Sequence, residues 1–402
     1  MSLEGWKKYK LGEIIEDIAM GPFGSNIKVD NFIDRGVPVI RGANLNEGGF
    51  DERSFVFVSE EKAQSLKRSL AYPDDLVFTH RGTIGQVGII PYNKFPKYLV
   101  SQSQMRLTVN KNFIEPKFLY YFFRSSVGQY ELLKNASQVG VPAIAQPTQS
   151  LKDVDIQIPD LETQKEIVNL LSTLDDKIVL NRETNSTLEA IAQAIFKEWF
   201  VDFNYPGATG ELVDSPLGPI PKGWRVTPLD QMATFLNGLA LQRYPPVPDE
   251  TPLPVIKIKE LRNGVTESSD LASRAIPEQY IVENGDLLFS WSGSLEVMFW
   301  AGGEGALNQH LFKVTSDEYP LWFVFLWIKH HLPNFRGIAA DKATTMGHIK
   351  RKDLTEALCL IPSDLAPAEN AFGPLFKLHL RNSLENSTLI NIRDLLLEDL
   401  IA

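Results

Sequence analysis

The sequence contains two copies of one long segment, and this duplication limits the possible folds more than any other feature. Trp6 to Leu11 matches Trp224 to Leu229, and Val37 to Arg41 matches Leu253 to Lys257. Later matches keep the same order: Asp75 to Thr79 with Asp286 to Ser290, and Ser101-Gln102 with Asn308-Gln309. The offset of about 200 residues far exceeds the roughly 20–50 residues of solenoid repeats. Each copy is therefore predicted to be a domain.

Within each copy, a pattern of short strands is followed by a helical pattern. Short β-branched or apolar runs bounded by Gly, Pro and Asn are typical of strands. The first copy has four of these runs: Val37 to Ile40, Leu76 to Thr79, Val87 to Ile90 and Met105 to Val109. Pro116 to Phe123 and Leu321 to Lys329 predict short amphipathic helices. Each globular portion is thus expected to mix α and β structure.

A longer helical pattern ends each copy. After Ile158-Pro159, apolar side chains alternate at steps of three and four from Ile167 to Trp199, until Pro206-Gly207 stops them. A comparable stripe follows Ile361-Pro362. Asparagines interrupt both stripes at corresponding positions: Asn181 and Asn185 in the first, Asn382 and Asn386 in the second. These polar steps predict a fixed register between two packed helices.

The predicted fold class is therefore α+β, with two mixed α/β domains related by internal duplication and separated by two long antiparallel coiled-coil helices. The predicted boundaries are residues 1–157 for the first domain, 158–205 for the central helix, 206–360 for the second domain and 361–402 for the C-terminal helix.

Charge and cysteine content exclude several classes of protein. The net charge is −10, although residues 1–150 carry 18 basic and 15 acidic side chains, against 5 and 11 in residues 151–205. This balance argues against binding nucleic acid by bulk electrostatics. A single cysteine excludes a disulfide framework, and the six histidines lack metal-ligand spacing. With neither a signal-peptide pattern nor an apolar run long enough to span a bilayer, the chain is expected to be cytoplasmic.

The motifs of the expected catalytic chemistries are absent from the sequence. It contains no Asn/Asp-Pro-Pro-Tyr/Phe tetrapeptide of amino-methyltransferases and no Gly-x4-Gly-Lys-Ser/Thr phosphate loop. Pro159-Asp160 followed by Asp175-x-Lys177 matches a nuclease pattern only loosely, and solvated acidic helix faces commonly produce such matches. We therefore predict no catalytic and no metal-binding residues in this chain.

The duplicated motifs together resemble the specificity subunits of Type I restriction-modification systems. The resemblance covers essentially the whole chain and rests on the start of each copy at Trp6 and Trp224, the Asp-Leu-Val/Leu-Phe-Thr/Ser strands, the helix entry from Ile158 to Gln164, and the tail from Phe196 to Phe203. It implies a non-catalytic subunit whose two target-recognition domains bind a bipartite, asymmetric DNA target.

The same resemblance implies the partners. Two adenine-N6 methyltransferase subunits would dock on the helices, and restriction subunits would join through them. S-adenosylmethionine, ATP and Mg²⁺ would belong to those partners, with no cofactor in this chain. The alternatives are a specificity component of a related Type II-like methyltransferase or nuclease, a fused enzyme with an unrecognised site, and an adaptor that binds only protein.

Base recognition requires forked donors and amides on loops, because Arg reads guanine and Asn or Gln reads adenine in the major groove. Polar loop residues, for each of which a turn or structural role is the alternative, provide the candidate DNA contacts: Asn26, Lys28, Arg41, Asn44, His80, Arg81, Thr83, Gln102, Gln104, Gln242, Arg243, Tyr244, Lys257, Lys259, Trp291, Ser292, Gln309, His310, Lys342, Thr344, Thr345 and Lys350. Lys28, Lys259 and Lys350 are expected to meet phosphate.

The end of the central helix carries more aromatic side chains than the packing of two helices requires. Phe196, Trp199, Phe200 and Phe203 are therefore predicted to dock a protein partner, with packing in the protein core as the alternative.

Overall fold

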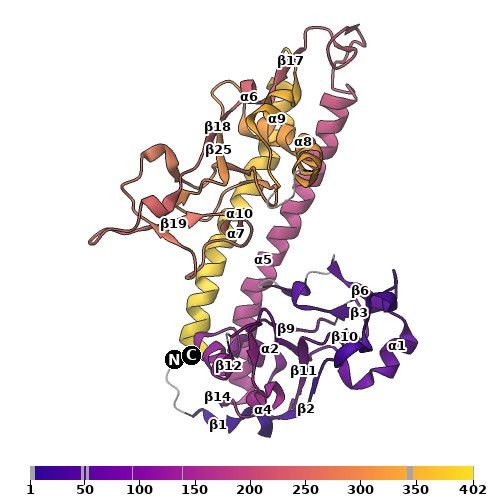
Figure 1. Ribbon diagram of the computed structural model, residues 1–402, viewed down its shortest axis with the longest axis vertical. Helices are drawn as coiled ribbons and strands as arrows, with labels where there is room; N and C mark the ends of the chain where they lie inside the picture. Colours follow the sequence, from indigo (N-terminus) through magenta and orange to yellow (C-terminus); the bar gives the residue numbers. More distant parts are fainter. Residues whose placement is uncertain are drawn as a thin grey trace. The chain divides into compact units, whose positions relative to one another are not determined.

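The computed structural model (Figure 1) describes residues 5–46, 49–50, 54–92, 94–137, 139–341 and 347–401. The chain forms two compact units, one of residues 1–179 with 389–402 and the other of residues 180–388. The first unit therefore joins the two ends of the sequence. Each unit is described below by itself.

The first unit contains two four-stranded sheets. One is antiparallel in the order β2-β11-β8-β9: Ile15–Met20, Gln104–Val109, Leu76–Thr79 and Val87–Ile89. The other has the order β6-β3-β10-β7: Val56–Val58, Val37–Ile40, Tyr98–Val100 and Leu70–Ala71. In the second sheet β3 and β10 are parallel. The runs predicted to be strands from their β-branched and apolar residues all lie in these sheets.

Smaller elements complete the first unit. Its short strands form three pairs: β1 with β14 (Lys7–Lys10, Asp155–Ile158), β4 with β5 (Leu45–Asn46, Gly49–Phe50) and β12 with β13 (Ala136–Ser137, Ala143–Ile144). Its short helices are α1 to α4: Glu60–Ser65, Pro116–Phe122, Ser126–Leu133 and Pro147–Lys152.

The second unit repeats this topology strand for strand. Its sheets have the orders β18-β25-β22-β23 (Thr234–Asn237, Leu311–Thr315, Leu287–Ser290, Val297–Phe299) and β20-β19-β24-β21 (Leu271–Ala272, Leu253–Ile256, Gly305–Leu307, Ile281–Val282). β17 (Arg225–Pro228) pairs with β26 (Leu358–Ile361), as β1 pairs with β14. The duplication inferred from the sequence is thus present in the order and direction of the strands.

The second unit also has elements of its own. β15 (Leu212–Val213) pairs with β16 (Ile220–Pro221). Its helices are α6 to α9: Leu229–Met232, Ile258–Asn263, Leu321–Asp341 and Arg351–Glu356. α8 extends well beyond the predicted end at Lys329 and contains Pro333 in its interior. The sequence prediction of a short helix was wrong here, because buried side chains on both sides of the proline hold the helix together.

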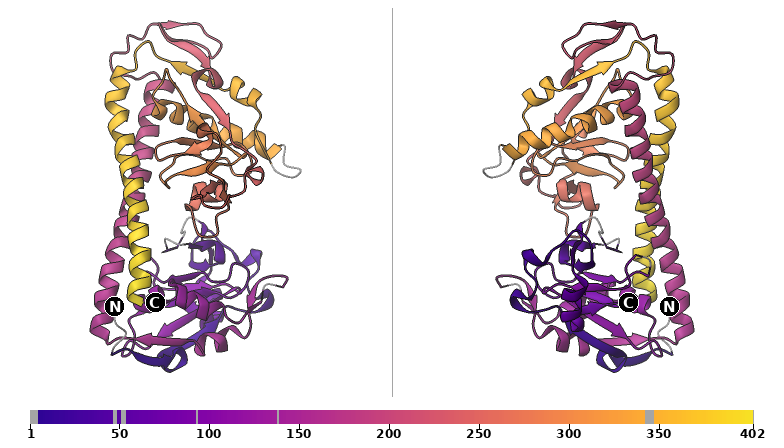
Figure 2. Two further views of the ribbon diagram at one scale, coloured as in Figure 1. Left: turned by 90° about the vertical axis from the view of Figure 1, so that its left-hand side faces the viewer. Right: turned by 90° about the vertical axis from the view of Figure 1, so that its right-hand side faces the viewer.

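Two long helices follow the globular portions, α5 (Leu161–Phe196) and α10 (Ala366–Ile401). Buried Gln164 fixes the entry to α5, because its amide donates to the carbonyls of Phe113 (3.0 Å) and Pro159 (2.9 Å). Within each unit the two helices lie side by side (Figure 2). In the second unit, Asn181 donates a hydrogen bond to Asn386, and Asn382 donates one to Asn185. As α5 advances from residue 181 to 185, its partner in α10 moves back from residue 386 to 382, so the helices are antiparallel. The predicted α+β fold class is confirmed.

In each unit, the largest hydrophobic cluster of the described residues includes part of the helix pair. In the first unit, Ile167 and Leu171 of α5 and Leu397 of α10 join the side chains beneath the antiparallel sheet. In the second, Phe196 and Phe200 pack with Phe323 of α8. The globular portions are therefore packed onto the helices through shared cores rather than through exposed contacts.

Candidate nucleic-acid interface

The residues that follow β8, His80 to Gly82, form an edge of the first unit that backbone hydrogen bonds hold in place. We call it the pinned edge. The amide of His80 donates to the carbonyl of Ser103 (3.0 Å), and its Nε2 lies 3.2 Å from the carbonyl of Gln102. Arg81 then forms a β-bridge with Ala143. Next, the Gly82 amide donates to the Pro142 carbonyl (2.8 Å) in a left-handed conformation, φ 89°. This edge joins three chain segments that the sequence separates.

The second unit builds the same edge after β22. The Trp291 amide donates to the carbonyl of His310 (3.3 Å), Ser292 forms a bridge with His348, and the Gly293 amide donates to the carbonyl of Gly347 (2.8 Å). The bond from Ile144 to the carbonyl of His80 (2.9 Å) has its counterpart from Ile349 to that of Trp291 (3.0 Å). The backbone is duplicated, whereas the side chains differ.

Two predicted DNA contacts are buried amides. Gln104 is fully buried, accepts a hydrogen bond from Ser101 and donates to Thr79 Oγ1 (3.2 Å). Asn44 is also fully buried, accepts from the Arg41 amide (2.9 Å) and donates to Ser54 Oγ (2.8 Å). Neither reaches the surface, so the prediction that they contact bases is not supported. These amides hold the loops in place.

His80 is nearly as enclosed. Its side chain is 7% exposed, and burial lowers the pKa of the imidazole below its usual value, against the effect of the hydrogen bond to the Gln102 carbonyl. A neutral ring suits a structural role between neighbouring loops. Arg41 is half-buried and its guanidinium donates to the carbonyl of Ser54, so it also belongs to this loop framework.

Other predicted contacts in the first unit are exposed: Asn26, Lys28, Arg81, Thr83 and Gln102. Gln102 lies in the wall of a hollow of about 240 Å³, where Ser101 and Arg41 provide polar groups and Ile27 and Phe32 provide apolar ones. Asn26 donates to the carbonyl of Phe23 (2.7 Å), which fixes the loop at the edge of this hollow. The structure thus brings Arg41 and Gln102 close to the loop that contains Asn26 and Ile27.

In the second unit, several predicted contacts form one polar and aromatic cluster. The indole nitrogen of Trp291 donates to Asn237 Oδ1 (2.9 Å) and to the carbonyl of Gln309 (3.1 Å). Ser292 Oγ lies 2.9 Å from His310 Nδ1, and Gln309 Nε2 lies 3.4 Å from the other ring nitrogen. Trp291, Gln309 and His310 are partly exposed, whereas Ser292 is buried.

The remaining predicted contacts of this unit differ in exposure. Gln242, Arg243, Lys259 and Lys350 are exposed, and Tyr244 is half-buried against a small apolar core. Lys257 pairs with Asp270, which lowers the pKa of that carboxyl, and Lys259 donates to Ser268 Oγ (3.0 Å). Lys342, Thr344 and Thr345 lie outside the described residues.

The aromatic residues predicted to dock a partner belong largely to the protein core. Phe196 is 4% and Phe200 is 3% exposed, so the alternative of core packing applies to both. Trp199 meets the ring of Phe372 at 5.8 Å, and Phe203 meets Trp224 at 5.7 Å. The prediction of an exposed aromatic docking surface was wrong for Phe196 and Phe200, because α8 and β17 approach this end of α5 and cover it.

The sequence prediction missed the tip of the hairpin between β12 and β13. Val139 is 89% exposed and Val141 is 58% exposed, and both lie within four residues of Ala143, which forms a bridge with Arg81. Residues 140–144 differ in type from their counterparts in the second copy, which marked the segment as variable. Sequence alone gave no reason to place it beside Arg81, because the two segments are about 60 residues apart.

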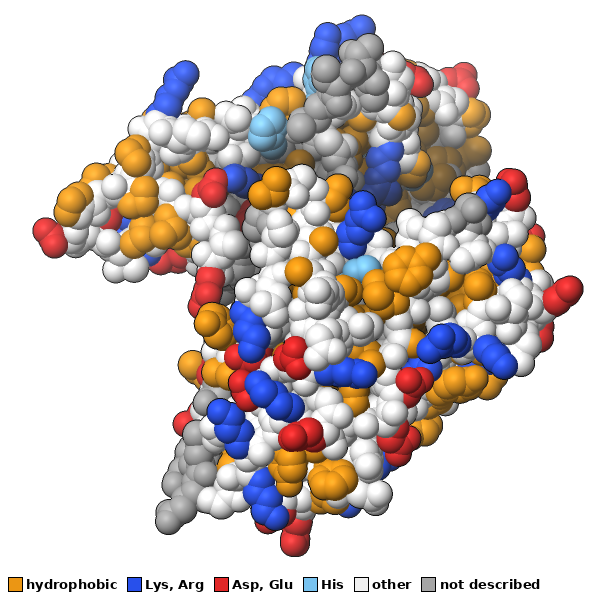
Figure 3. Space-filling view, turned by 60° about the horizontal axis from the view of Figure 1, so that its bottom comes forward, with side chains coloured by type: hydrophobic (Ala, Val, Ile, Leu, Met, Phe, Trp, Pro, Cys, Tyr) orange, Lys and Arg blue, Asp and Glu red, His pale blue; other side chains and the backbone are white. Residues whose placement is uncertain are grey.

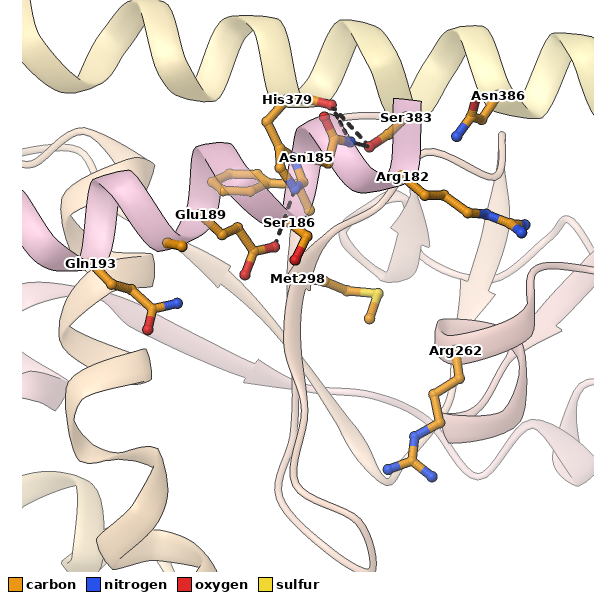
Figure 4. Close-up of a pocket in the computed structure, with 12 residues that line it drawn as sticks. Arg182, Asn185, Ser186, Glu189, Gln193, Arg262, Met298, His379, Ser383 and Asn386 are labelled. Atoms are coloured by element: carbon orange, nitrogen blue, oxygen red, sulfur yellow. Dashed lines mark hydrogen bonds and ion pairs between the residues drawn. The ribbon is translucent and has the colours of Figure 1, made fainter. Parts of the chain in front are cut away.

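A second hollow, of about 640 Å³, lies in the second unit between the helix pair and the globular portion (Figure 4). Glu189 lies in its wall, with Oε1 3.1 Å from His379 Nε2 and Oε2 3.2 Å from Lys329 Nζ. Burial disfavours the charged carboxylate, but these two partners outweigh it and hold the pKa of Glu189 below its usual value. This network connects α5, α8 and α10.

Charge is dispersed rather than concentrated. On the face seen in Figure 3, Lys and Arg side chains are interspersed with acidic and hydrophobic ones.

Within the described residues, no group of three or more His, Cys, Asp and Glu side chains could hold a metal ion, and no helix is long and apolar enough to cross a membrane.

Comparison with known proteins shows which family the chain resembles. Residues 3–190 match the family model of the Type I restriction modification DNA specificity domain. The MjaIX specificity subunit of Methanocaldococcus jannaschii, a Type I restriction enzyme subunit, is 29% identical over 365 residues, which cover 86% of this chain and 80% of the relative. The chain is therefore similar to the specificity subunits of Type I restriction-modification systems.

Further relatives of this family span the whole chain. The Type I restriction enzyme HindI specificity subunit of Haemophilus influenzae is 22% identical, with 99% of each chain covered. The crystal structure of the S subunit of a Type I restriction-modification system from M. genitalium matches with a TM-score of 0.54, at 14% identity, over 99% of this chain and 96% of that one. The family model and the names of these relatives describe DNA specificity subunits of Type I restriction enzymes.

Proposed function

We propose that this specificity subunit binds a bipartite, asymmetric DNA target, and that each unit reads one half of it. One observation carries the proposal: the two units hold the same backbone edge by equivalent hydrogen bonds, after β8 and after β22, and present different side chains on it. A fixed frame with variable polar side chains is what direct readout of two different base sequences requires.

Partner subunits supply the remaining chemistry in this proposal. The long helices carry outward apolar side chains, such as Leu170 and Ile191 on α5 and Leu378 and Ile392 on α10, each 41–46% exposed. Such side chains on a helical surface are suited to protein contacts. We propose that methyltransferase subunits dock there and restriction subunits join through them, and that S-adenosylmethionine, ATP and Mg²⁺ bind those partners in the cytoplasm.

Sequencing of methylated adenines tests the proposal directly. A host that carries this chain with methyltransferase subunits is expected to show methylation at a single two-part motif. Replacement of residues 1–157 by the first domain of another family member is expected to change only one half of the motif. Tyr121 and Ser126 must be kept in the exchanged domain, because they bond to Asp175 and Glu398 of the helices.

The matched control is the reciprocal exchange of residues 206–360, which is expected to change only the other half of the motif. A change in both halves from either exchange, with the protein folded, would contradict independent reading. Methylation without any sequence preference would favour the protein-only adaptor.

A further inference from the structure

The tip of the β12/β13 hairpin has an unusual composition for a turn. Tight turns favour Gly, Asn, Asp and Ser, and β-branched side chains are disfavoured there. Here Val139 and Val141 flank Gly140, which adopts the left-handed φ of 74° that the turn requires. With 89% and 58% of their surfaces exposed, the two valines contribute little to the core of the unit.

Backbone hydrogen bonds hold the base of this hairpin, next to the exposed valines. β12 and β13 pair Ala136 with Ile144 and Ser137 with Ala143. The Pro142 carbonyl accepts the Gly82 amide (2.8 Å), and the Ile144 amide donates to the His80 carbonyl (2.9 Å). Two exposed apolar side chains on a braced turn are preorganised for contact with another molecule.

The neighbours of the tip favour DNA over protein as that molecule. Arg81, which forms the bridge with Ala143, is exposed and is a forked donor suited to guanine or phosphate. In the second copy the same bracing bonds hold Gly347 and Ile349, but the sequence there, Thr344-Thr345-Met346-Gly347, replaces the valines. If this turn docked a partner subunit common to both copies, the same side-chain chemistry would be expected twice.

The major groove offers one apolar feature, the 5-methyl group of thymine, and apolar side chains recognise it by contact. We infer that the Val139-Gly140-Val141 tip enters the major groove and contacts thymine methyl groups in the half-site read by the first unit, with Arg81 beside it. This inference rests on the proposed function. A half-site with a methylatable adenine contains a thymine in the opposite strand, so the ligand is present.

Binding to duplexes in which single thymines are replaced by deoxyuridine tests this inference. The full chain in complex with methyltransferase subunits is titrated with a duplex that contains the motif found by sequencing of methylated adenines. It is then titrated with duplexes in which one thymine of that motif is replaced by deoxyuridine, so that each lacks one 5-methyl group. At one or two positions of the first half-site, loss of the methyl is expected to weaken binding by about fourfold, the value of one buried methyl group.

The double variant Val139→Ala/Val141→Ala removes the protein side of the contact. It is expected to bind the thymine and deoxyuridine duplexes equally, at the weaker affinity. Val139→Thr/Val141→Thr, which keeps the side-chain shape, is a second variant in case the first is unstable, and it is expected to retain part of the discrimination. Val127→Ala, a change at a 41% exposed valine on α3, is the matched control and is expected to leave discrimination intact.

Several results would overturn the inference. The first is that no thymine of the first half-site can be replaced by deoxyuridine with a loss of affinity. The second is that the double alanine variant still distinguishes thymine from deoxyuridine. The third is that the double alanine variant binds all duplexes more weakly by the same factor, which indicates a wedge or backbone contact. Loss of complex assembly in the double variant would assign the tip to a protein partner. If the wild-type complex did not distinguish the motif from a scrambled duplex, the proposed function itself would fail, which is a separate outcome.

Discussion

Arg81 is an exposed forked donor on the pinned edge of the first unit. The Arg81→Lys variant keeps the positive charge but loses the paired donors that read guanine O6 and N7. If Arg81 contacts a base, discrimination at a single base pair of the first half-site is expected to fall by roughly 10- to 100-fold, corresponding to about 1–3 kcal/mol. Competition binding with duplexes mutated at each position measures the change.

Arg68→Lys is a suitable control for Arg81→Lys, because Arg68 is also exposed in the first unit. It is expected to leave the base preference unchanged. Equal weakening of Arg81→Lys on all sequences would assign Arg81 to phosphate contact instead.

His331 makes the stability of the second unit depend on pH. Burial, with a smaller contribution from His330, lowers the pKa of the imidazole to about 4, and Nε2 lies 3.0 Å from the Leu358 carbonyl, to which it donates. Between pH 6.5 and 4, the unfolded chain binds a proton that the folded chain does not, so the free energy of unfolding falls as the pH falls. Denaturant unfolding is expected to show a loss of roughly 2–3 kcal/mol across this range.

The variant His331→Gln provides the control for that pH dependence. Glutamine can keep the donor to the Leu358 carbonyl but does not titrate, so the slope between pH 6.5 and 4 is expected to flatten. An unchanged slope would show that other groups cause the acid sensitivity.

At the level of single residues, sequence could not separate structural amides from functional ones. Gln104 and Gln102 stand two positions apart, yet Gln104 is fully buried and Gln102 is exposed. An amide at a strand end has the same appearance in sequence whether it braces a loop or faces solvent. The pairing of β11 with β8, which places Gln104 opposite Thr79, decides this for Gln104, whereas Gln102 lies in the turn before β11.

Among the elements, the paired helices derive their register from a layer of asparagines. Asn382 donates to Asn185 Oδ1 (3.0 Å), and Asn185 donates to the carbonyl of His379 and to Ser383 Oγ, both at 3.0 Å. Asn185→Leu removes the acceptor of the Asn382 amide, and Asn382→Leu removes the donor to Asn185 Oδ1, each at a cost of about 1–3 kcal/mol. Chemical denaturation of the single and double variants measures these costs.

The double variant Asn185→Leu/Asn382→Leu is expected to cost less than the sum of the two single changes, by about 1–2 kcal/mol, because two apolar side chains can pack together. Strict additivity would contradict a direct coupling across the helix pair. Glu183→Leu, at an exposed position of α5, serves as the surface control.

The elements themselves were largely predictable, whereas their arrangement was not. Runs such as Val37 to Ile40 and Leu76 to Thr79 identified strands, because β-branched residues bounded by turn formers have few other uses. The pairing of β2 with β11 joins segments about 90 residues apart, which periodicity does not report. The length of α8 was underestimated, because a proline such as Pro333 normally ends a helix. Here tertiary packing keeps the chain helical on both sides of it.

At the scale of the whole molecule, the last helix completes the first unit. Glu398 accepts hydrogen bonds from the Ser126 amide (2.8 Å) and hydroxyl (2.5 Å), and Arg393 pairs with Asp175 (2.9 Å). Leu397 is 3% exposed in the core of that unit, whereas Leu395 is 74% exposed. These contacts join sequence positions more than 200 residues apart.

Alanine substitution at these two leucines measures how much the first unit depends on α10. Leu397→Ala is expected to lower the free energy of unfolding of the first unit by about 2–4 kcal/mol through lost burial and a residual cavity. Leu395→Ala is expected to change it by less than about 0.5 kcal/mol. Native-state amide exchange over residues 5–157 localises the effect, and equal results for the two variants would refute it.

This closure has a consequence for synthesis. A ribosome releases the sheets of the first unit more than 200 residues before Leu397 and Ile401, which seal their core beside Ile167 and Leu171. During that interval of synthesis, the nascent chain carries an unsealed apolar surface on a domain whose strands are already present. A domain of this design depends on chaperones or on fast elongation more than its length suggests, and stalled chains are the species most prone to aggregate.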